Sequence, residues 1–146
     1  MSKAEKVKEA GKVFDMGYSC SQAVLSAYAE DFGLDRDTAL KIAGGFGGGM
    51  GATGCTCGAL TGAIMAIGLK YRGAESGNSE AKMKTYAAVQ KAMRLFEERN
   101  GSTLCRDLID CDISTPEGHA AAREKGAFNV CSDLVRSAVE ILNEVM

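Results

Sequence analysis

The sequence predicts an all-α protein, a compact multi-helix bundle with a glycine-rich loop before a buried central helix. Three observations support this fold class. Apolar residues recur every three or four positions along most of the chain, which is the spacing of one helix face. The single proline, Pro116, leaves long helices uninterrupted. Seven of the eleven residues 44–54 are glycine, and no regular helix tolerates that density, because each glycine costs roughly 1 kcal/mol relative to alanine.

Three helices are expected before the glycine-rich segment. Their ranges are 3–16, 19–32 and 35–43. Gly33 is a suitable stop for the second helix, because glycine readily takes the left-handed conformation that ends many helices. Asp35 is a suitable N-cap for the third, since its carboxylate can accept hydrogen bonds from the free N–H groups of a first turn.

Five further helices are expected after the glycine-rich segment. The first, 57–69, is apolar on almost every side and carries small residues, so we expect it to be the buried central helix. A polar loop, 72–79, separates it from a long amphipathic helix. The remaining expected ranges are 79–99, 102–109, 114–125 and 129–145.

The starts of the last three helices carry recognisable N-terminal signals. Ser102 and Asn129 are suitable N-caps, because their side chains can accept from the first free N–H groups of a helix. Ser114-Thr115-Pro116-Glu117 is a capping-box pattern with a proline in the first turn. These signals place the helix boundaries more firmly than apolar spacing does alone.

Length and composition indicate one globular domain over residues 1–146. Hydrophobic residues make up 46% of the chain and charged residues 25%, which is typical of folded domains and excludes extensive disorder. The 17 basic and 19 acidic residues give a net charge of −2. Nucleic-acid-binding proteins usually have a basic excess, so no nucleic acid partner is expected.

The chain carries no pattern of a membrane or secreted protein. The longest apolar stretch, 59–69, is shorter than the about 20 residues that a membrane span needs. The first residues lack the apolar segment of a secretory signal. We therefore expect a cytoplasmic protein with no membrane partner. In that reducing compartment, six cysteines indicate metal binding or redox chemistry rather than structural disulfides.

Four of the six cysteines share one position relative to the predicted helices. Each precedes apolar residues at helical offsets, so each lies in a first turn on the inward face. They are Cys20, Cys57, Cys105 and Cys131. A helix N-terminus has a partial positive charge and free N–H donors, which stabilise a thiolate and lower the thiol pKa. We predict one shared metal or redox site, with Cys55 and Cys111 as additional thiols. The alternative is that each cysteine is a small core residue.

The cysteine spacing excludes several common metal motifs. Cys55-Thr56-Cys57 is a C-x-C pair, which differs from the paired C-x-x-C knuckles of zinc ribbons. The C-x-x-C-x-x-C run of bacterial ferredoxins and the C-x-x-C-H haem motif are both absent. Ligands spread from Cys20 to Cys131 would need a scaffold that folds before metal binds.

These residues resemble a family of redox-active proteins named for its cysteine pattern, C_GCAxxG_C_C. The resemblance covers nearly the whole chain and implies that Cys20, Cys57, Cys105 and Cys131 are the family cysteines. A related region of split-Soret cytochromes implies an iron–sulfur centre as the cofactor. The absence of haem-attachment motifs means that only this non-haem part is implied here. The matching segments are Tyr18-Ser19-Cys20-Ser21-Gln22-Ala23-Val24, the glycine run, Cys57-Gly58-Ala59-Leu60-Thr61-Gly62-Ala63-Ile64, Gly101-Ser102, Cys105-Arg106-Asp107-Leu108, and Cys131 with Val135.

The glycine-rich segment contains a pattern of its own. Residues 49–54 fit G-x-G-x-x-G, but a dinucleotide site also needs a preceding strand, and none is predicted. No lysine follows the glycines as it would in a P-loop. We expect the glycines to let the backbone pass close to the cysteines, where N–H groups would donate to cluster sulfurs and tune the reduction potential. The glycines concerned are Gly48, Gly49, Gly51 and Gly54.

Three functions from different classes remain open. The first is an iron–sulfur electron carrier or redox module that serves an unidentified redox partner protein. The second is a metal-free thiol–disulfide protein in which Cys55 and Cys57 exchange a disulfide and another thiol, such as Cys111, resolves it. The third is a zinc-stabilised interaction module whose helix 79–99 forms a homodimer face. The single histidine, His119, is expected to be exposed in a polar first turn rather than to bind metal.

Overall fold

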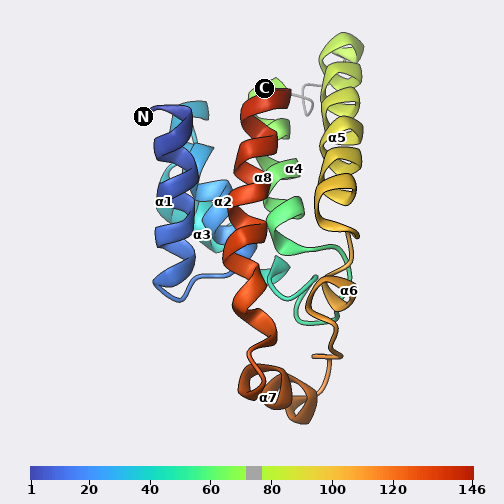
Figure 1. Cartoon of the computed structure of the whole chain (residues 1–146). Helices are drawn as coiled ribbons and strands as arrows, with labels where there is room; N and C mark the ends of the chain where they lie inside the picture. Colours follow the sequence, from blue (N-terminus) through green and yellow to red (C-terminus); the bar gives the residue numbers. More distant parts are fainter. Residues whose placement is uncertain (72–76) are drawn as a thin grey trace.

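The computed structural model describes residues 1–71 and 77–146, and these residues fold into helices joined by turns (Figure 1). Within these described residues, three short 3-10 helices adjoin the α-helices: Glu30–Phe32, Gly44–Phe46 and Ala127–Val130. The all-α fold class is thus confirmed, while residues 72–76 of the expected polar loop lie outside the described residues. The α-helices of the described part are α1 (Lys3–Asp15), α2 (Cys20–Ala29), α3 (Arg36–Ala43), α4 (Gly58–Tyr71), α5 (Ser79–Asn100), α6 (Cys105–Ile109), α7 (Pro116–Glu124) and α8 (Cys131–Val145).

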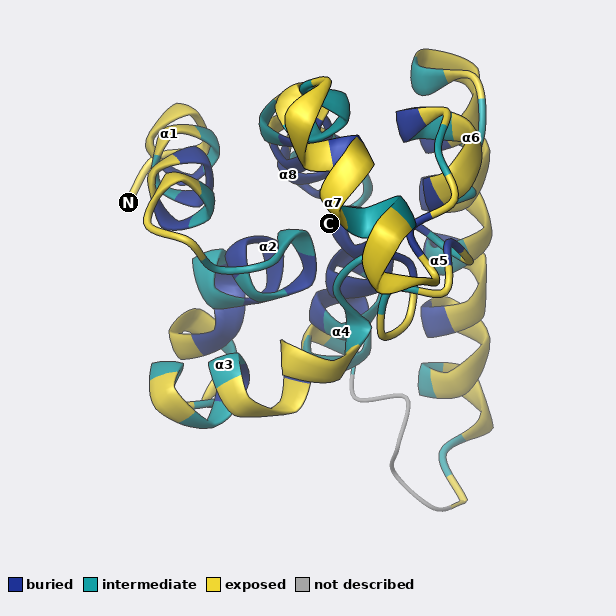
Figure 2. Cartoon of the chain, turned by 90° about the horizontal axis from the view of Figure 1, so that it is seen from below, coloured by how far each residue is buried: buried dark blue, intermediate teal, exposed yellow. Residues whose placement is uncertain are grey.

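The helix α4 is the buried centre of the bundle. It packs against α2, α5 and α8, and its residues Leu60 and Ile67 are at most 1% exposed. Small residues allow the close approach of α2, because a methyl group at Gly62 would lie only 2.7 Å from the carbonyl oxygen of Ser21. In the end-on view of Figure 2, the buried faces of α1, α2, α4 and α8 are turned toward one another. No helix of the described residues, α4 included, is long and apolar enough to cross a membrane.

The first helix starts and stops follow the sequence signals. Ser19 precedes α2 and forms a capping box with Gln22, in which the Ser19 hydroxyl accepts from the Gln22 N–H. Gly33 ends the 3-10 turn after α2 in the left-handed conformation, with a φ of 85°. Asp35 caps α3 by accepting from the Thr38 N–H at 2.9 Å. The expectations for Gly33 and Asp35 are confirmed, whereas the capping box at Ser19 was not identified in the sequence analysis.

Two predicted caps near the end of the chain are wrong. Asn129 does not cap the last helix, because it lies inside the 3-10 helix Ala127–Val130, which runs directly into α8. Ser102 does not cap α6, because that helix begins only at Cys105. The Ser102 hydroxyl instead accepts from the Leu104 N–H at 3.0 Å and orders the turn before the helix.

The capping signal before α7 is shifted by one residue. Thr115, rather than Ser114, is the N-cap, because the Thr115 hydroxyl accepts from the Gly118 N–H at 3.0 Å. Pro116 then occupies the first helical position, where a missing N–H costs nothing. The sequence Ser-Thr-Pro therefore predicts the start of a helix only to within one residue.

The glycine-rich segment contains a left-handed turn. Five consecutive residues, from Gly48 to Ala52, have φ values between 58° and 71°. Met50 and Ala52 are not glycine, so each carries a conformational cost of roughly 1–2 kcal/mol. A hydrogen bond from the Cys55 N–H to the Gly49 carbonyl oxygen, at 2.9 Å, holds the end of the turn. The expected loop is therefore present, and it brings the chain to Cys55 along one defined path.

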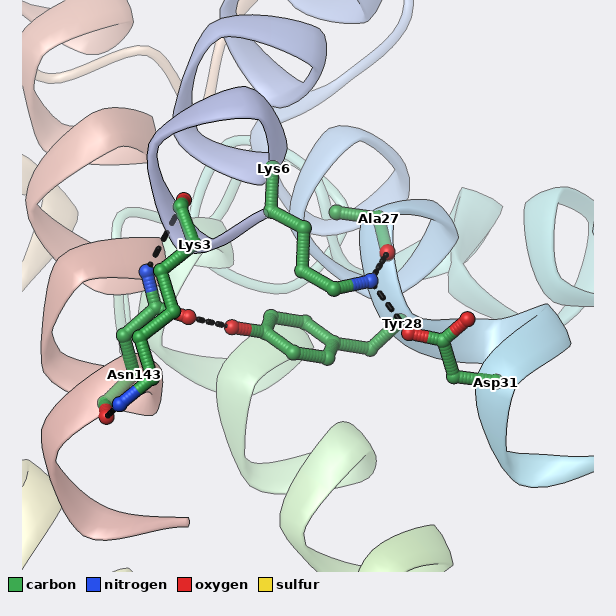
Figure 3. A network of polar contacts seen from close by, with 6 residues as sticks. All are labelled: Lys3, Lys6, Ala27, Tyr28, Asp31 and Asn143. Carbon is green, nitrogen blue, oxygen red and sulfur yellow. Dashed lines mark hydrogen bonds and ion pairs between the residues drawn. The ribbon is translucent and has the colours of Figure 1, made fainter. Parts of the chain in front are cut away.

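A polar network joins α1, α2 and α8 at the end of the bundle that holds both chain ends (Figures 1 and 3). The Lys6 ammonium of α1 donates to the Ala27 carbonyl oxygen at 3.0 Å and forms an ion pair with Asp31. The same ammonium lies 4.5 Å from the centre of the Tyr28 ring. The Tyr28 hydroxyl donates to the side-chain oxygen of Asn143 in α8. These contacts fix three helices at one end, so their other ends meet in a defined arrangement.

Candidate functional site

A cavity of about 250 Å³ lies where α2, α4, α6 and α8 begin, at the lower end of the bundle in Figure 1. Four of the six cysteines line it, one from each of these helix starts. They are Cys20, Cys57, Cys105 and Cys131. The other walls are mostly apolar and include Phe14, Leu108, Ile109, Ile113, Phe128 and Leu134. The structure thus brings together the four cysteines that the sequence singled out.

Each of the four cysteines is placed by a helix start. Cys20, Cys105 and Cys131 are the first residues of α2, α6 and α8. Cys57 immediately precedes α4, because this helix begins at Gly58, one residue later than expected. The Cys57 carbonyl oxygen accepts from the Leu60 N–H at 3.0 Å. All four cysteines therefore lie at the N-terminal ends of helices, and these helix ends surround the cavity.

A short antiparallel pairing holds Cys57 near Cys105. The two segments meet at an isolated bridge between Thr56 and Leu104. Beside that bridge, the Cys105 N–H donates to the carbonyl oxygen of Cys55 at 2.6 Å. Because these bonds join backbone atoms, the two cysteines are positioned whether or not their sulfurs bind a ligand.

The left-handed turn comes closest to the paired segments of Cys55 and Cys105 at Gly49. A methyl group built at Gly49 would lie 2.6 Å from the backbone nitrogen of Cys55. It would also lie 2.7 Å from the β-carbon of Cys105. No side chain fits in that space, so position 49 requires glycine for space as well as for its φ of 70°.

The thiols of Cys20 and Cys131 both line the cavity and affect each other's titration. Their mutual interaction raises the pKa of Cys20 well above its usual value and lowers the pKa of Cys131. Burial and the charges of Cys57 and Cys105 raise the pKa of Cys20 further. Of these two thiols, Cys131 therefore gives up its proton more readily.

Burial keeps the other two cavity thiols protonated. Removal from water raises the pKa of Cys57 to about 11 and that of Cys105 to about 12. The backbone N–H groups of Ala59 and Leu60 oppose the shift at Cys57 without outweighing it. The expectation that helix N-termini lower the pKa of all four cysteines is wrong for Cys20, Cys57 and Cys105. Desolvation and the neighbouring thiols outweigh the effect of the helix ends.

The four cavity thiols are soft donors, but in the described residues they are not arranged as a preformed site for a metal ion. Among residues 1–71 and 77–146, no group of three or more His, Cys, Asp or Glu side chains is arranged to hold a metal ion. A tetrahedral zinc ion needs its sulfurs about 3.8 Å apart, since each zinc–sulfur bond is about 2.3 Å long. Binding of any metal centre to these four thiols would have to displace their protons.

The cavity is also lined by the single histidine of the chain, which the sequence analysis expected to be exposed. His119 of α7 lines the cavity and packs against Phe128, with the two ring centres 5.3 Å apart. His119 is half-buried, so the expectation that it is exposed was wrong. Its position depends on how the segment 110–130 folds back over the helix starts, and no local pattern in the sequence signals that fold.

Only one of the four glycines expected to donate backbone hydrogen bonds lines the cavity. This is Gly48, and its N–H has no hydrogen-bond acceptor within the described part of the chain. Gly47 and Gly58 also line the cavity and were missed by the sequence analysis. The other expected donors, Gly49, Gly51 and Gly54, are not part of the lining.

The two remaining cysteines lie outside the cavity. Cys55 is exposed and accepts a hydrogen bond from the Thr53 hydroxyl at 3.4 Å. Cys111 lines a separate surface hollow beside Arg106. All six cysteines are free thiols in the structure. Cys57 is only 3% exposed, so the two members of the C-x-C pair have very different surroundings.

The part of the chain that matches a known protein family contains all four cavity cysteines. Residues 18–145 match the model of a protein family described as "Putative redox-active protein (C_GCAxxG_C_C)". A relative, an uncharacterized protein of Archaeoglobus fulgidus, is 32% identical over 151 aligned positions. That alignment covers 97% of this chain and 93% of the relative. No solved structure matches the chain significantly.

Proposed function

The chain belongs to the C_GCAxxG_C_C family of redox-active proteins, and on this premise we propose that it binds an iron–sulfur cluster and transfers electrons. The cluster ligands would be Cys20, Cys57, Cys105 and Cys131. One observation supports this above all: four thiols from four separate helix starts line a single, largely apolar cavity. Thiolates are the usual ligands of iron–sulfur clusters, and a prefolded scaffold can supply them from distant positions.

Several groups in the cavity would adapt it to electron transfer. Bound there, the cluster would supply a one-electron couple that the side chains of the protein lack. Apolar residues such as Phe14 and Leu134 would exclude water from the sulfurs. The N–H of Gly48 and the imidazole of His119 are available as hydrogen-bond donors. Donors near sulfur favour the more negative, reduced state and so raise the reduction potential.

The glycine-rich turn would be the closest approach for a redox partner protein. Gly47 and Gly48 form one wall of the cavity and have no side chains to thicken it. On the outer side of the same turn, Met50 is 40% exposed. A partner that docked there would lie nearer to the cavity than one that docked on α5. We place the protein in a reducing compartment such as the cytoplasm, where the ligand thiols stay reduced.

Purification without oxygen, followed by iron, sulfide and visible absorption measurements, tests this proposal. We expect a brown protein with matching amounts of iron and sulfide. Single serine substitutions of the four cavity cysteines should each lower the cluster content. Cys111→Ser is the matched control and should leave it unchanged, because Cys111 lies outside the cavity. Circular dichroism of each variant would separate loss of a ligand from loss of the fold.

Other outcomes of the same assay point to the other functions. A protein that contains neither iron nor sulfide after cluster reconstitution contradicts the proposal. Stoichiometric zinc without a redox couple would instead favour the zinc-stabilised module. A colourless, metal-free protein that exchanges thiols for disulfides would favour metal-free redox chemistry.

A further inference from the structure

We propose that two copies of the chain associate as an antiparallel homodimer through the outer face of α5. This helix lies along one edge of the bundle, and the side that it turns away from α4 and α8 is exposed (Figures 1 and 2). Among the described residues that line the cysteine cavity, none belongs to α5. The contact also needs no metal, so it differs from the zinc-stabilised module that the sequence leaves open.

Three large apolar side chains form a stripe along this outer face. Met83, Tyr86 and Met93 are 63%, 52% and 37% exposed. With Gln90 they follow one another at intervals of three, four and three residues, which places all four on one side of a helix. Apolar side chains gathered on one exposed face are typical of a protein–protein contact, and Met and Tyr are enriched in such contacts. The buried residues of α5 lie on its opposite side, and they are Thr85, Ala88, Ala92 and Phe96.

The two ends of the stripe have complementary shapes. Met83 and Tyr86, near the N-terminal end of α5, are its two most exposed apolar side chains. A surface hollow lies at the other end, beside Met93. A twofold axis that crosses α5 near Gln90 brings the exposed side chains of each copy to the hollow of the other, which is the usual symmetry of a homodimer. The hollow is lined by Met93, Arg94, Glu97, Glu98, Gly101 and Thr103.

The charges beside the stripe are complementary under the same axis. The exposed Lys82 and Lys84 lie near the N-terminal end of α5, and the exposed Glu97 and Glu98 lie near its C-terminal end. An antiparallel pairing brings the lysines of each copy near the glutamates of the other, whereas a parallel pairing would bring like charges together. Lys84 already forms an ion pair with Glu80 of its own helix. Lys82 and Glu97 are therefore the pair that we expect to meet across the dimer.

The contact is small, so the dimer should be reversible. With 22 residues, α5 is about 33 Å long. Because one helix from each chain takes part, the buried area falls at the low end of the range for specific complexes. We therefore expect an equilibrium between monomer and dimer that depends on concentration. Both cysteine cavities of the dimer would stay open to a redox partner protein at the glycine-rich turn.

Sedimentation velocity over a range of concentrations tests the dimer. The mean mass should rise from that of one chain, 15.3 kDa, toward twice that value. Tyr86→Glu should raise the dissociation constant of the dimer at least about tenfold, because it places a charge in the centre of the contact. Ile42→Glu on α3 is the matched control and should leave the constant unchanged, since Ile42 is also 52% exposed. A chain that stays monomeric up to millimolar concentration overturns the proposal.

A charge swap tests the orientation of the two helices. Lys82→Glu and Glu97→Lys should each weaken the dimer, because each brings like charges together at both ends of the contact. The double variant restores opposite charges and should recover the affinity of the unmodified chain. Circular dichroism of each variant shows whether the helices are intact. Failure of the double variant to recover the dimer, while it remains folded, contradicts the antiparallel arrangement.

Cross-linking with a carbodiimide gives a second measure of the orientation, because this reagent joins a carboxylate directly to a touching amine. Lys82 and Glu97 are 15 residues apart on one helix, about 22 Å, so a direct link between them can only join two chains. After digestion with trypsin, we expect peptide 73–84 joined to peptide 95–99 in the dimer. A dimer without this link would also overturn the proposal. None of these measurements depends on iron, so their failure can be told from failure of the proposed function.

Discussion

The hydroxyl of Tyr28 in α2 donates a hydrogen bond to the side-chain oxygen of Asn143 in α8, 115 residues further along the chain (Figure 3). The amide nitrogen of Asn143 in turn donates to the carbonyl oxygen of Lys3 at 3.2 Å. The side chain of Asn143 in α8 is therefore hydrogen-bonded to both α2 and α1. The contact lies at the end of the bundle opposite the cysteines, so it bears on stability rather than on the chemistry of the cavity.

Tyr28→Phe should lower the free energy of unfolding by about 1–2 kcal/mol. The substitution keeps the ring against Lys6 and Phe32 but leaves the half-buried Asn143 oxygen without its donor. Urea unfolding followed by circular dichroism measures the change. Tyr18→Phe is the matched control, because the Tyr18 hydroxyl has no hydrogen-bond partner in the described residues. Equal effects of the two substitutions would show that the Tyr28–Asn143 bond adds nothing.

Alanine substitutions at two glycines of the left-handed turn should have unequal effects. Gly49 and Gly51 have φ values of 70° and 58°, so alanine at either position costs roughly 1–2 kcal/mol in backbone conformation. At Gly51 the nearest atom to the new methyl group would be 3.8 Å away. At Gly49 the methyl group would collide with Cys55 and Cys105, which adds about 1–3 kcal/mol. Urea unfolding of both variants measures the difference, and equal losses would contradict this account of the turn.

Alkylation should distinguish the two cysteines of the C-x-C pair in the metal-free protein. Cys55 is exposed, whereas burial raises the pKa of Cys57 to about 11. At pH 8 only about one Cys57 thiol in a thousand is then a thiolate, the form that reacts with iodoacetamide. We expect Cys57 to react far more slowly than Cys55 and to speed up as the pH rises toward 11.

The single variants Cys55→Ser and Cys57→Ser give a clean measurement of these rates. Tryptic peptide 42–70 then carries one cysteine, so its labelled fraction reports one thiol. Similar rates for the two thiols at pH 8 would mean that Cys57 is neither buried nor shifted in pKa. That result would also restore the C-x-C pair as a candidate for disulfide exchange.

His119→Phe should lower the reduction potential of the cluster-bound protein without a matching loss of stability. Phenylalanine keeps the packing against Phe128 but removes the N–H donor. A hydrogen bond that favours the reduced state by about 1 kcal/mol corresponds to roughly 40 mV for a one-electron couple. Potentiometric titration measures the shift, and His119→Gln, which keeps a donor, should reverse part of it. An unchanged potential in both variants would show that His119 does not affect the reduction potential.

The helices could be predicted from the sequence because their signals are local. Apolar residues at helical spacing locate α1 and α2, and the side chain of Asp35 marks the start of α3. Asn129 was misassigned because a 3-10 turn leads into α8 without a side-chain cap. The sequence alone does not show whether such a residue caps a helix or lies in the turn before it, since both positions favour short polar side chains.

The candidate site could be predicted only in part, for a related reason. The position of a cysteine at a helix start is a local property, and it identified the four residues that line the cavity. Their pKa values depend on burial, which outweighed the helix-end effect at Cys57 and Cys105. The presence of His119 in the same cavity depends on the path of a whole segment. Neither burial nor that path leaves a pattern within a few residues of the side chain concerned.

The wide separation of the four cavity cysteines along the chain affects when the site can be completed during synthesis. Protein chains leave the ribosome N-terminus first, and their folding follows the same direction. Cys20, Cys57 and Cys105 therefore emerge well before Cys131, which begins α8. A nascent chain that lacks α8 has neither the fourth thiol nor the helix that covers α1, α2 and α4. Any group that needs all four thiols can be inserted only after this region has been translated. The presence of such a group therefore indicates that α8 has been made and has folded against the bundle.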